Sequence, residues 1–300
     1  MDMTQNKCCR HGANLRRRRR RRRKILRSII FSCSIIAVAV FVAVGSSMIR
    51  SGDGGTNRYD VEAGNNTYDN AVIENSKISE KNKIQNNQSM LDDIMNSTQY
   101  PKQLKDLALK NEEALEFVYD YPAEHVKEHT IDLTEEASMD SVPLFVQWDK
   151  RWGYEKYSGN FFAASGCGPT TLSMVVVYLT HNREASPIAV AKYSKEAGYS
   201  VDGSGSSWTL ISEGCMHYGV KAKAVALDES RMKAELDEGH PIVVNVGPGD
   251  FTDTGHFMVI TGYDDEGFSI NDPNSIEKSG KRWLFRNISS QIRAVWSMYV

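Results

Sequence analysis

The sequence has few cysteines, and their positions exclude a fold held together by several disulfide bridges. Cys8 and Cys9 precede the one long apolar run, Cys33 lies within it, and only Cys167 and Cys215 follow it. Two cysteines cannot form the framework of bridges that stabilises small secreted domains. A folded domain must therefore rest on a hydrophobic core, and the sequence leaves a single Cys167–Cys215 bridge open.

The sequence also lacks a second long apolar run, which excludes a protein that crosses a membrane several times. The single run, residues 28–49, holds 22 uncharged residues and follows eight consecutive arginines at 16–23. That length spans a bilayer, and flanking cations stay in the cytoplasm. We therefore expect a basic cytoplasmic tail over 1–27, a transmembrane signal-anchor over 28–49 in the cell membrane, and an extracellular chain beyond it. A cleaved secretory signal, with small residues at 43–45, is the alternative and would make the protein secreted.

Charge is divided unevenly along the chain. Residues 1–27 carry 12 basic and 1 acidic side chains and the rest carries 24 basic and 37 acidic ones, although the formal net charge is only −2. An acidic body is a poor match for a phosphate backbone, so we expect no nucleic-acid partner. The histidines and cysteines lack the spacing of zinc ligands, so we expect no metal and no other cofactor.

Two different segments lie between the apolar run and the main domain. Residues 50–100 are rich in Asn, Ser, Asp, Gly and Lys, and cannot bury enough surface to offset their ordering entropy. They are predicted to form a flexible, disordered stalk. Beyond Pro101, apolar residues fall on one face of a helix that ends near Tyr121, which predicts a helical connector over 101–141 that packs on the next domain. The residues on this face are Leu104, Leu107, Ala108, Leu115 and Val118.

Residues 142–300 alternate helix and strand signals with short Gly, Pro and Asp punctuation, which predicts a compact α+β domain. The first helix of this domain follows the stretch Ser165–Thr171, in which Pro169 suits the first helical turn. Cys167 is therefore expected at a helix N-terminus, where free amides and the helix dipole favour the thiolate that a cysteine nucleophile needs. A small buried cysteine before a core helix is the alternative interpretation. The buried face of this helix is expected to hold Leu172, Val175, Val176 and Leu179.

A cysteine nucleophile requires a histidine, and His256 is the best placed of the seven. It begins the run 256–263, which has the pattern of a buried strand. A histidine at the start of a core strand lies where strand ends meet a cleft. The other histidines lie in the tail, the polar connector, in turns, or on a helix where a surface position is the simplest interpretation.

The next predicted strand, 268–272, is joined to the first by residues 264–267, which predicts an antiparallel hairpin. With a small bulge or a loose loop, the register places His256 opposite Asp272. The Asp272 carboxylate would then accept a hydrogen bond from His256 and fix the orientation of the ring. A turn-forming aspartate before Pro273 is the alternative. Asn271 alternates to the opposite face and is the weaker candidate for this role.

These residues together resemble a known family. The stretches 166–170 (Gly-Cys-Gly-Pro-Thr), 255–257 (Gly-His-Phe) and 271–273 (Asn-Asp-Pro) are similar, in this order, to motifs of the C39-like cysteine peptidases, a compact branch of the papain-like superfold. The resemblance covers about residues 142–300. It implies a papain-like fold, in which a helix carrying the cysteine packs on an antiparallel sheet carrying the histidine and the aspartate. It also implies a triad of Cys167, His256 and Asp272.

The family further implies an upstream glutamine that stabilises the oxyanion, and Gln147 is the candidate. Gln147 lies twenty residues before Cys167, much farther than the short gap of the bacteriocin-leader C39 peptidases, and a polar strand residue beside Trp148 is the alternative. The related transporters join such a domain to membrane spans and a nucleotide-binding cassette. The sequence contains one apolar run and no G-x-x-x-x-G-K-[ST] loop, so cleavage coupled to transport is not expected.

The sequence therefore predicts a membrane-anchored, extracytoplasmic cysteine peptidase that acts on a peptide or protein substrate. A cell-wall peptide amidase or an acyl transferase with the same triad is a second interpretation, because the superfold supports all of these reactions. A peptide-binding domain of the same fold without turnover is a third. The presence of all three triad residue types favours an enzyme.

Overall fold

The computed structural model describes the backbone of residues 66–300 and the side chains of residues 79–300. The cytoplasmic tail predicted at 1–27 and the membrane anchor predicted at 28–49 lie outside these residues. Within the described part of the chain, no helix is both long enough and apolar enough to cross a membrane.

Much of the predicted stalk is a long helix, α2 (Asn66–Asn96). Its last turns bury Ile94 completely, and Met90 and Leu91 pack on the same cluster of buried residues. These three residues share one face of the helix because they are three and four positions apart. The prediction of a flexible stalk over 50–100 is therefore wrong for residues 66–96, since a few apolar side chains near the end of the segment find partners in the connector.

The connector is a series of short helices and not the single helix that the apolar spacing predicts. Its elements are α3 (Lys102–Lys110), the 3-10 turn η1 (Glu112–Ala114), α4 (Leu115–Tyr119) and α5 (Tyr121–Glu124). Asn111 interrupts the series with an extended backbone, at φ −133°, and its side chain accepts a hydrogen bond from the amide of Glu113. An asparagine that caps the next turn in this way competes with helix continuation.

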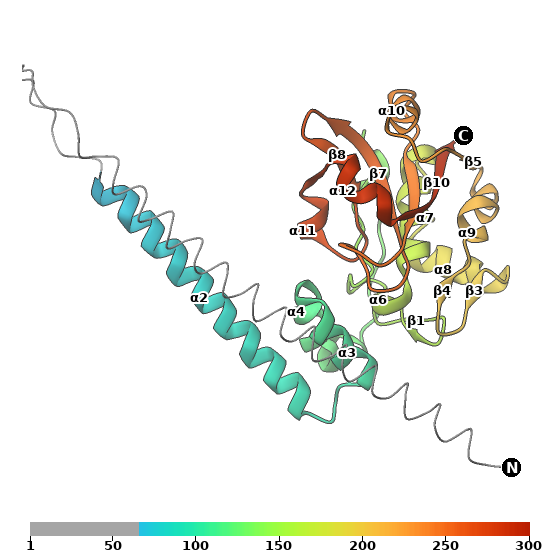
Figure 1. The fold of residues 1–300 in the computed structure, drawn as a ribbon. Helices are drawn as coiled ribbons and strands as arrows, with labels where there is room; N and C mark the ends of the chain where they lie inside the picture. The colour runs from blue at the N-terminus through green and yellow to red at the C-terminus, as the bar shows by residue number, and fades with distance from the viewer. Residues whose placement is uncertain (1–65) are drawn as a thin grey trace, which may run out of the picture. The chain divides into compact units, whose positions relative to one another are not determined.

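The connector packs on the domain that follows, as the sequence predicts. All five residues expected on its buried face are buried. They form one cluster with Phe161 and Ala163 of the domain, and α3 lies close to helix α6 (Phe162–Ser165) (Figure 1). The connector and the domain therefore share a hydrophobic core.

The domain is built on a six-stranded sheet with the strand order β5-β10-β6-β7-β8-β9, in which all neighbouring strands are antiparallel. The strands are β5 (Lys221–Ala224), β6 (Ile242–Val246), β7 (His256–Asp264), β8 (Gly267–Asn271), β9 (Arg282–Trp283) and β10 (Ile292–Tyr299). The two central strands, β6 and β7, therefore have neighbours on both sides.

Side chains of alternate residues in the central strands pack into two separate hydrophobic clusters, one on each face of the sheet. In β7, Phe257 and Val259 belong to one cluster, whereas Met258 and Ile260 belong to the other. Helices cover both faces of the sheet (Figure 1). The helices are α7 (Cys167–Thr180) and α8 (Pro187–Glu196) on the first face, and α10 (Glu229–Asp237) and α12 (Phe285–Ile288) on the second. The predicted α+β domain, with the cysteine-bearing helix packed on an antiparallel sheet, is confirmed.

The domain also contains several shorter elements, and two small ladders lie near the beginning of α7. β1 pairs with β2 and β3 pairs with β4, each as a small antiparallel ladder. The shorter elements are β1 (Lys156–Tyr157), β2 (Asn160–Phe161), β3 (Ser200–Val201), β4 (Gly205–Ser206), α9 (Thr209–Ser212), α11 (Ile276–Ser279) and the 3-10 turns η2 (Glu136–Ser138), η3 (Gly214–Tyr218) and η4 (Ser289–Gln291). Because β2 leads into α6 and β4 contacts α7, these ladders shape the surroundings of the Cys167 end of that helix.

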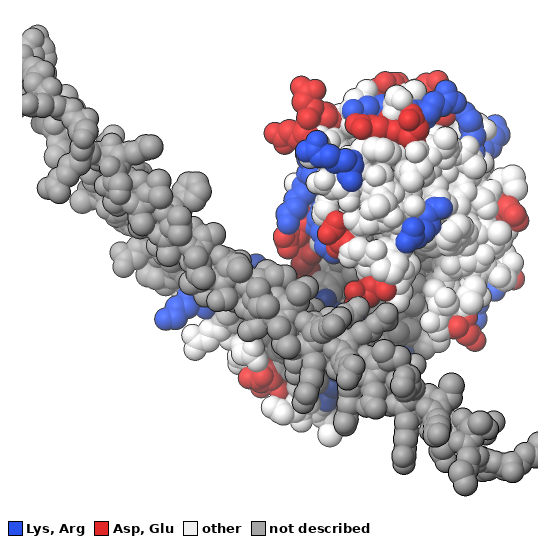
Figure 2. Space-filling view, in the orientation of Figure 1, with Lys and Arg blue, Asp and Glu red and all other residues white. Residues whose placement is uncertain are grey.

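Charged side chains gather at one end of the domain, over α10 and the β7–β8 turn (Figure 2). Both signs are present there. Lys233 pairs with Glu229 at 2.9 Å, and Arg282 pairs with Asp264 at 2.6 Å. Exposed pairs of this kind contribute little to stability, so the stability of the domain rests mainly on its buried clusters.

Truncation of Leu104 tests whether the connector is part of the folded unit. Leu104 is fully buried in the shared cluster, so Leu104→Ala should lower the free energy of unfolding by about 2–5 kcal/mol. Leu109 lies on the same helix but is 57% exposed, and Leu109→Ala should change that free energy by less than about 0.5 kcal/mol. Urea unfolding of the full chain measures both. Equally small effects would show that the connector is not packed on the domain.

Candidate active site

Cys167 is the first residue of α7, where the sequence predicts it. Close packing fixes this end of the helix. A Cβ at Gly168 would lie 2.6 Å from Ser206 Oγ, and a Cβ at Gly166 would lie 2.6 Å from the ring of Phe162. The two glycines are therefore needed for the approach of β4 and α6, and Cys167 remains partly exposed between them.

The sulfur of Cys167 faces a cleft of about 620 Å³. Several glycines line it, and Gly205 has φ +86°, which favours glycine. At these glycines the wall of the cleft has no side chain, so another polypeptide backbone could come close to Cys167. Arg293 is the one charged residue among those described as lining the cleft.

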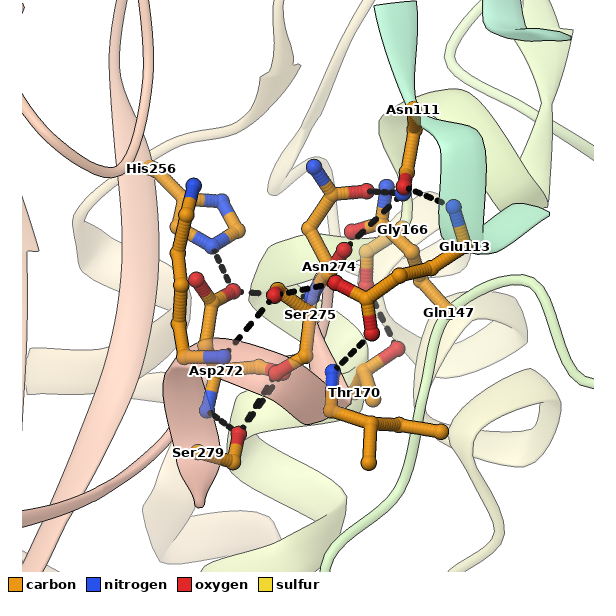
Figure 3. Close-up of polar contacts among 12 residues, drawn as sticks. Asn111, Glu113, Gln147, Gly166, Thr170, His256, Asp272, Asn274, Ser275 and Ser279 are labelled. Carbon is orange, nitrogen blue, oxygen red and sulfur yellow. Dashed lines mark hydrogen bonds and ion pairs between the residues drawn. The ribbon is translucent and has the colours of Figure 1, made fainter. Parts of the chain in front are cut away.

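His256 begins β7 and lies between Cys167 and Asp272. Its Nε2 atom is 2.6 Å from Asp272 Oδ1 (Figure 3), and its ring is close enough to Cys167 to lower the pKa of that thiol. Because Nε2 is directed at Asp272, Nδ1 is the ring nitrogen left for Cys167. His256 and Asp272 are both buried. The structure thus brings three of the predicted site residues together.

The strand register that produces this contact differs from the predicted one. The hairpin closes in a tight turn and pairs Val259 with Asn271, so His256 does not lie opposite Asp272 in the ladder. A bulge in the middle of the hairpin shifts the pairing by one residue. Strand β8 ends at Asn271, and the chain then turns, with Ser275 N donating to Asp272 O at 3.1 Å. The predicted register is therefore wrong, and the turn after the strand carries the carboxylate to the imidazole.

Asp272 has both of the roles that the sequence offered as alternatives. As a turn residue, its Oδ1 accepts a hydrogen bond from Asn274 N at 2.8 Å, and its own amide donates to Ser279 Oγ at 2.9 Å. As a partner of His256, the same Oδ1 accepts from the imidazole. The turn and the histidine contact therefore depend on one oxygen atom.

The electrostatics favour a charged pair of Cys167 and His256. Burial opposes the positive charge of His256, but the charge of Asp272, its hydrogen bond and the contact with Cys167 outweigh burial and raise the pKa of His256 to about 10. Burial also opposes a thiolate at Cys167, yet the hydrogen bond and charge of His256 lower the pKa of Cys167 below its ordinary value. Thiolate and imidazolium thus stabilise each other.

Two backbone amides complete the surroundings of the sulfur. The backbone N–H groups of Phe257 and Gly168 help to lower the pKa of the Cys167 thiol and so favour the thiolate. No sequence pattern indicates these two groups, because a backbone amide has no residue-type signature and its direction depends on how β7 meets α7. The only feature of the sequence that points to this environment is Gly168, because a glycine lets neighbouring backbone come close.

Cys215 has the opposite environment. It is fully buried, and desolvation raises the pKa of its thiol to about 11. Both Cys167 and Cys215 are free thiols, so the bridge between them that the sequence left open does not form. Only Cys167 combines a cleft, a histidine partner and a lowered pKa within the described part of the chain.

Gln147 and Asn271 hold neighbouring segments in place. The side chain of Gln147 is buried and its Nε2 donates to Ala163 O at 2.7 Å, while its backbone amide donates to Pro273 O at 2.7 Å. Gln147 is not among the residues that line the cleft. Asn271 Nδ2 donates to the carbonyls of Val142 and Pro143, which ties β8 to the start of the domain.

One group of residues has the composition of a metal site. Glu235, Glu238 and His240 offer ligand atoms within 4.8 Å of one another. Glu235 already accepts hydrogen bonds from Ser297 Oγ at 2.7 Å and Lys223 Nζ at 3.0 Å, and these partners, with His240, lower its pKa to about 2. The negative charge of this carboxylate is thus balanced by protein groups, which favours a structural ion pair over a metal site.

Two solved structures are similar to part of this chain. One is the peptidase domain of Streptococcus ComA, a bi-functional ABC transporter involved in a quorum-sensing pathway, with 19% identity, a TM-score of 0.36, and coverage of 45% of this chain and 90% of that one. The other is a putative C39-like peptidase from Bacillus anthracis, with 16% identity, a TM-score of 0.33, and coverage of 56% and 97%. No curated protein matches the chain.

The match to a family model is more extensive. The model of the Peptidase_C39 like family matches residues 139–300, which is more than half of the chain and contains Cys167, His256 and Asp272. By this match, the chain belongs to the Peptidase_C39 like family.

Proposed function

We propose that the protein is a cysteine peptidase that hydrolyses peptide bonds through Cys167, His256 and Asp272. The single observation that carries this proposal is the row of residues in which a buried carboxylate bonds a buried imidazole that lowers the pKa of a thiol at a helix N-terminus. Membership of the Peptidase_C39 like family supports it. The row supplies a nucleophile, a proton carrier and an orienting carboxylate, which are the three roles that acyl transfer needs.

The proposed reaction begins with the thiolate of Cys167, which attacks the carbonyl carbon of the substrate peptide and forms an oxyanion. The imidazolium of His256 then gives its proton to the leaving nitrogen as the C–N bond breaks, and a thioester remains on Cys167. Neutral His256 next takes a proton from water, and the resulting hydroxide attacks the thioester. The C–S bond breaks, the acid product leaves, and the thiolate and imidazolium are restored. Asp272 keeps the ring oriented throughout.

The oxyanion is proposed to bind at the beginning of α7. The backbone amide of Cys167 lies at the positive end of a 14-residue helix, where a developing negative charge is stabilised. Gln147 is the second proposed donor, as the family resemblance implies. Its Nε2 donates to Ala163 O, and Gln147 does not line the cleft, so this role rests on the family resemblance alone.

Substitution of Asp272 tests the proposed triad. Asp272→Ala removes the acceptor for His256 Nε2, so it should lower kcat about 100-fold or more, and Cys167→Ala should abolish turnover. Asp272→Asn should be milder, because an amide oxygen still accepts the bond. Hydrolysis of a mixed peptide library by the purified full chain, followed by mass spectrometry, measures turnover, and thermal unfolding checks the fold.

Asp253 provides the matched control. It is an exposed carboxylate three positions before His256, so Asp253→Ala should leave turnover within about twofold. If Asp272→Ala lowers the stability of the fold but leaves the activity per folded molecule unchanged, Asp272 serves only to form the turn.

The same assay separates the alternative functions. If the unmodified protein hydrolyses no peptide and Cys167 reacts like an ordinary thiol, a peptide-binding domain is favoured. Transfer of the acyl group to an amine, in preference to water, would favour an acyl transferase, and cleavage of cell-wall peptides alone would favour an amidase.

We also propose that residues 28–49 anchor the peptidase in the cell membrane with the catalytic domain outside. The support is the uncharged run of 22 residues directly after a strongly basic tail. The full-length protein should then remain in the membrane fraction after carbonate extraction, and protease added to intact cells should remove the domain. A soluble product that begins near Ser46 would instead identify a cleaved signal and a secreted protein.

A further inference from the structure

The loop that carries Asp272 lies beyond the end of the sheet, so the strand ladder does not hold it. Strand β8 ends at Asn271, and residues 272–275 turn into α11, a helix of only four residues. Ile276, the first residue of α11, is 51% exposed. A carboxylate that must orient an imidazole needs a more rigid support than a short turn followed by an exposed four-residue helix provides.

Asn111 of the connector contacts the residue that supports the Asp272 carboxylate. Asn111 Nδ2 donates to the backbone oxygen of Asn274 at 2.9 Å and to its Oδ1 at 3.1 Å (Figure 3). The amide of Asn274 in turn donates to Asp272 Oδ1, the oxygen that accepts from His256. Asn111 is thus linked to the imidazole of His256 through Asn274 and Asp272.

Glu113 of the connector holds the other end of the same loop (Figure 3). One of its carboxylate oxygens accepts a hydrogen bond from Ser275 Oγ. The other accepts from the backbone amides of Ile276 at 2.7 Å and Glu277 at 3.0 Å. Hydrogen bonds to a charged carboxylate are stronger than neutral ones, and three of them converge here on the turn that follows Asp272.

These two side chains are directed at the loop by the break in the connector. Asn111 has an extended backbone between α3 and η1, and its Oδ1 accepts a hydrogen bond from Glu113 N. One continuous helix would place the two residues differently. Both precede residue 139, where the match to the family model begins, so the support for the loop comes from outside the matched domain.

We propose that Asn111 and Glu113 are positioning residues, which hold the Asp272 loop from the connector and thereby fix the orientation of His256 toward Cys167. The inference rests on the proposed function, because it assigns a role within that triad. It makes the connector a required part of the catalytic unit and not a passive link to the segment before it.

The surroundings of Glu113 supply a matched control. It lies in a groove whose other charged residues are Glu112, Glu116, Asp120, Glu277 and Lys83. Glu116 is exposed, and in the described structure no hydrogen bond or ion pair joins its side chain to the loop. Glu116→Ala therefore removes one negative charge from the same groove without removing a contact to the loop.

The test is the pH dependence of iodoacetamide alkylation at Cys167 in the purified full chain, read from the labelled peptide by mass spectrometry. This readout reports the Cys167–His256 pair and needs no substrate. Glu113→Ala and Asn111→Asp should lower the rate at pH 6 about tenfold, because a displaced Asp272 stabilises imidazolium, and hence thiolate, less well. The acid limb of the pH profile should move to higher pH, because the thiolate forms only at higher pH when the imidazolium is less stable.

Two variants separate positioning from general stability. Glu113→Gln retains a side-chain oxygen that can accept from the two backbone amides, and its amide NH2 can donate to Ser275 Oγ. This variant should therefore keep the alkylation rate within about twofold of the unmodified protein. Asn111→Asp retains the oxygen that caps η1 and replaces the Nδ2 donor by a charged oxygen that the two oxygens of Asn274 repel. It therefore tests the proposal even if Glu113→Ala does not fold. Glu116→Ala should match the unmodified protein.

The possible failures are distinguishable. If iodoacetamide alkylates Cys167 of the unmodified protein with the pH dependence of an ordinary thiol, the proposed function fails. If the unmodified protein reacts at low pH, and Glu113→Ala and Asn111→Asp keep its pH profile, the positioning proposal alone is overturned. A lower unfolding temperature with an unchanged pH profile would likewise overturn it, because the contacts would then be structural only.

Discussion

The hydrogen bond between His256 Nε2 and Asp272 Oδ1, 2.6 Å long and buried, is the interaction on which the candidate site depends. Without the carboxylate, a buried imidazole favours its neutral form. With it, the imidazolium persists and lowers the pKa of the Cys167 thiol against the opposing effect of burial. The proposed covalent reaction at the cleft therefore requires a carboxylate that is held in place on the far side of the histidine.

The sequence predicts those parts of the site that depend on local patterns, namely the positions of Cys167 and His256. The Gly-Pro context and the apolar spacing place Cys167 at a helix N-terminus, and the apolar run after His256 places it at the start of a strand. The hairpin register that points to Asp272 is wrong, because the hairpin closes in a tight turn that pairs Asp264 with Gly267 and its bulge shifts the pairing by only one residue. The contact forms nonetheless, since a side chain just past a strand end can reach back across the sheet.

The parts that sequence reasoning missed are those that depend on distant contacts. The composition of α2 predicts a flexible segment, because Ile94 gains its partners only from the folded connector. The apolar spacing of the connector predicts one helix, because the capping role of Asn111 leaves no trace in that pattern. The contacts of Asn111 and Glu113 with the Asp272 loop join residues more than 160 positions apart, and no periodicity or motif indicates such a pairing.

The central claim is that Cys167 is a thiolate paired with imidazolium, and ultraviolet titration tests it most directly. The difference in thiolate absorbance between the full chain and Cys167→Ser isolates this one sulfur from Cys215 and from the three cysteines nearer the N-terminus. The account predicts that the difference signal is already present at neutral pH and falls in acid, because the His256 charge lowers the pKa of Cys167. A signal that appears only as the pH rises through about 8–9, the range of an ordinary thiol, would contradict the account.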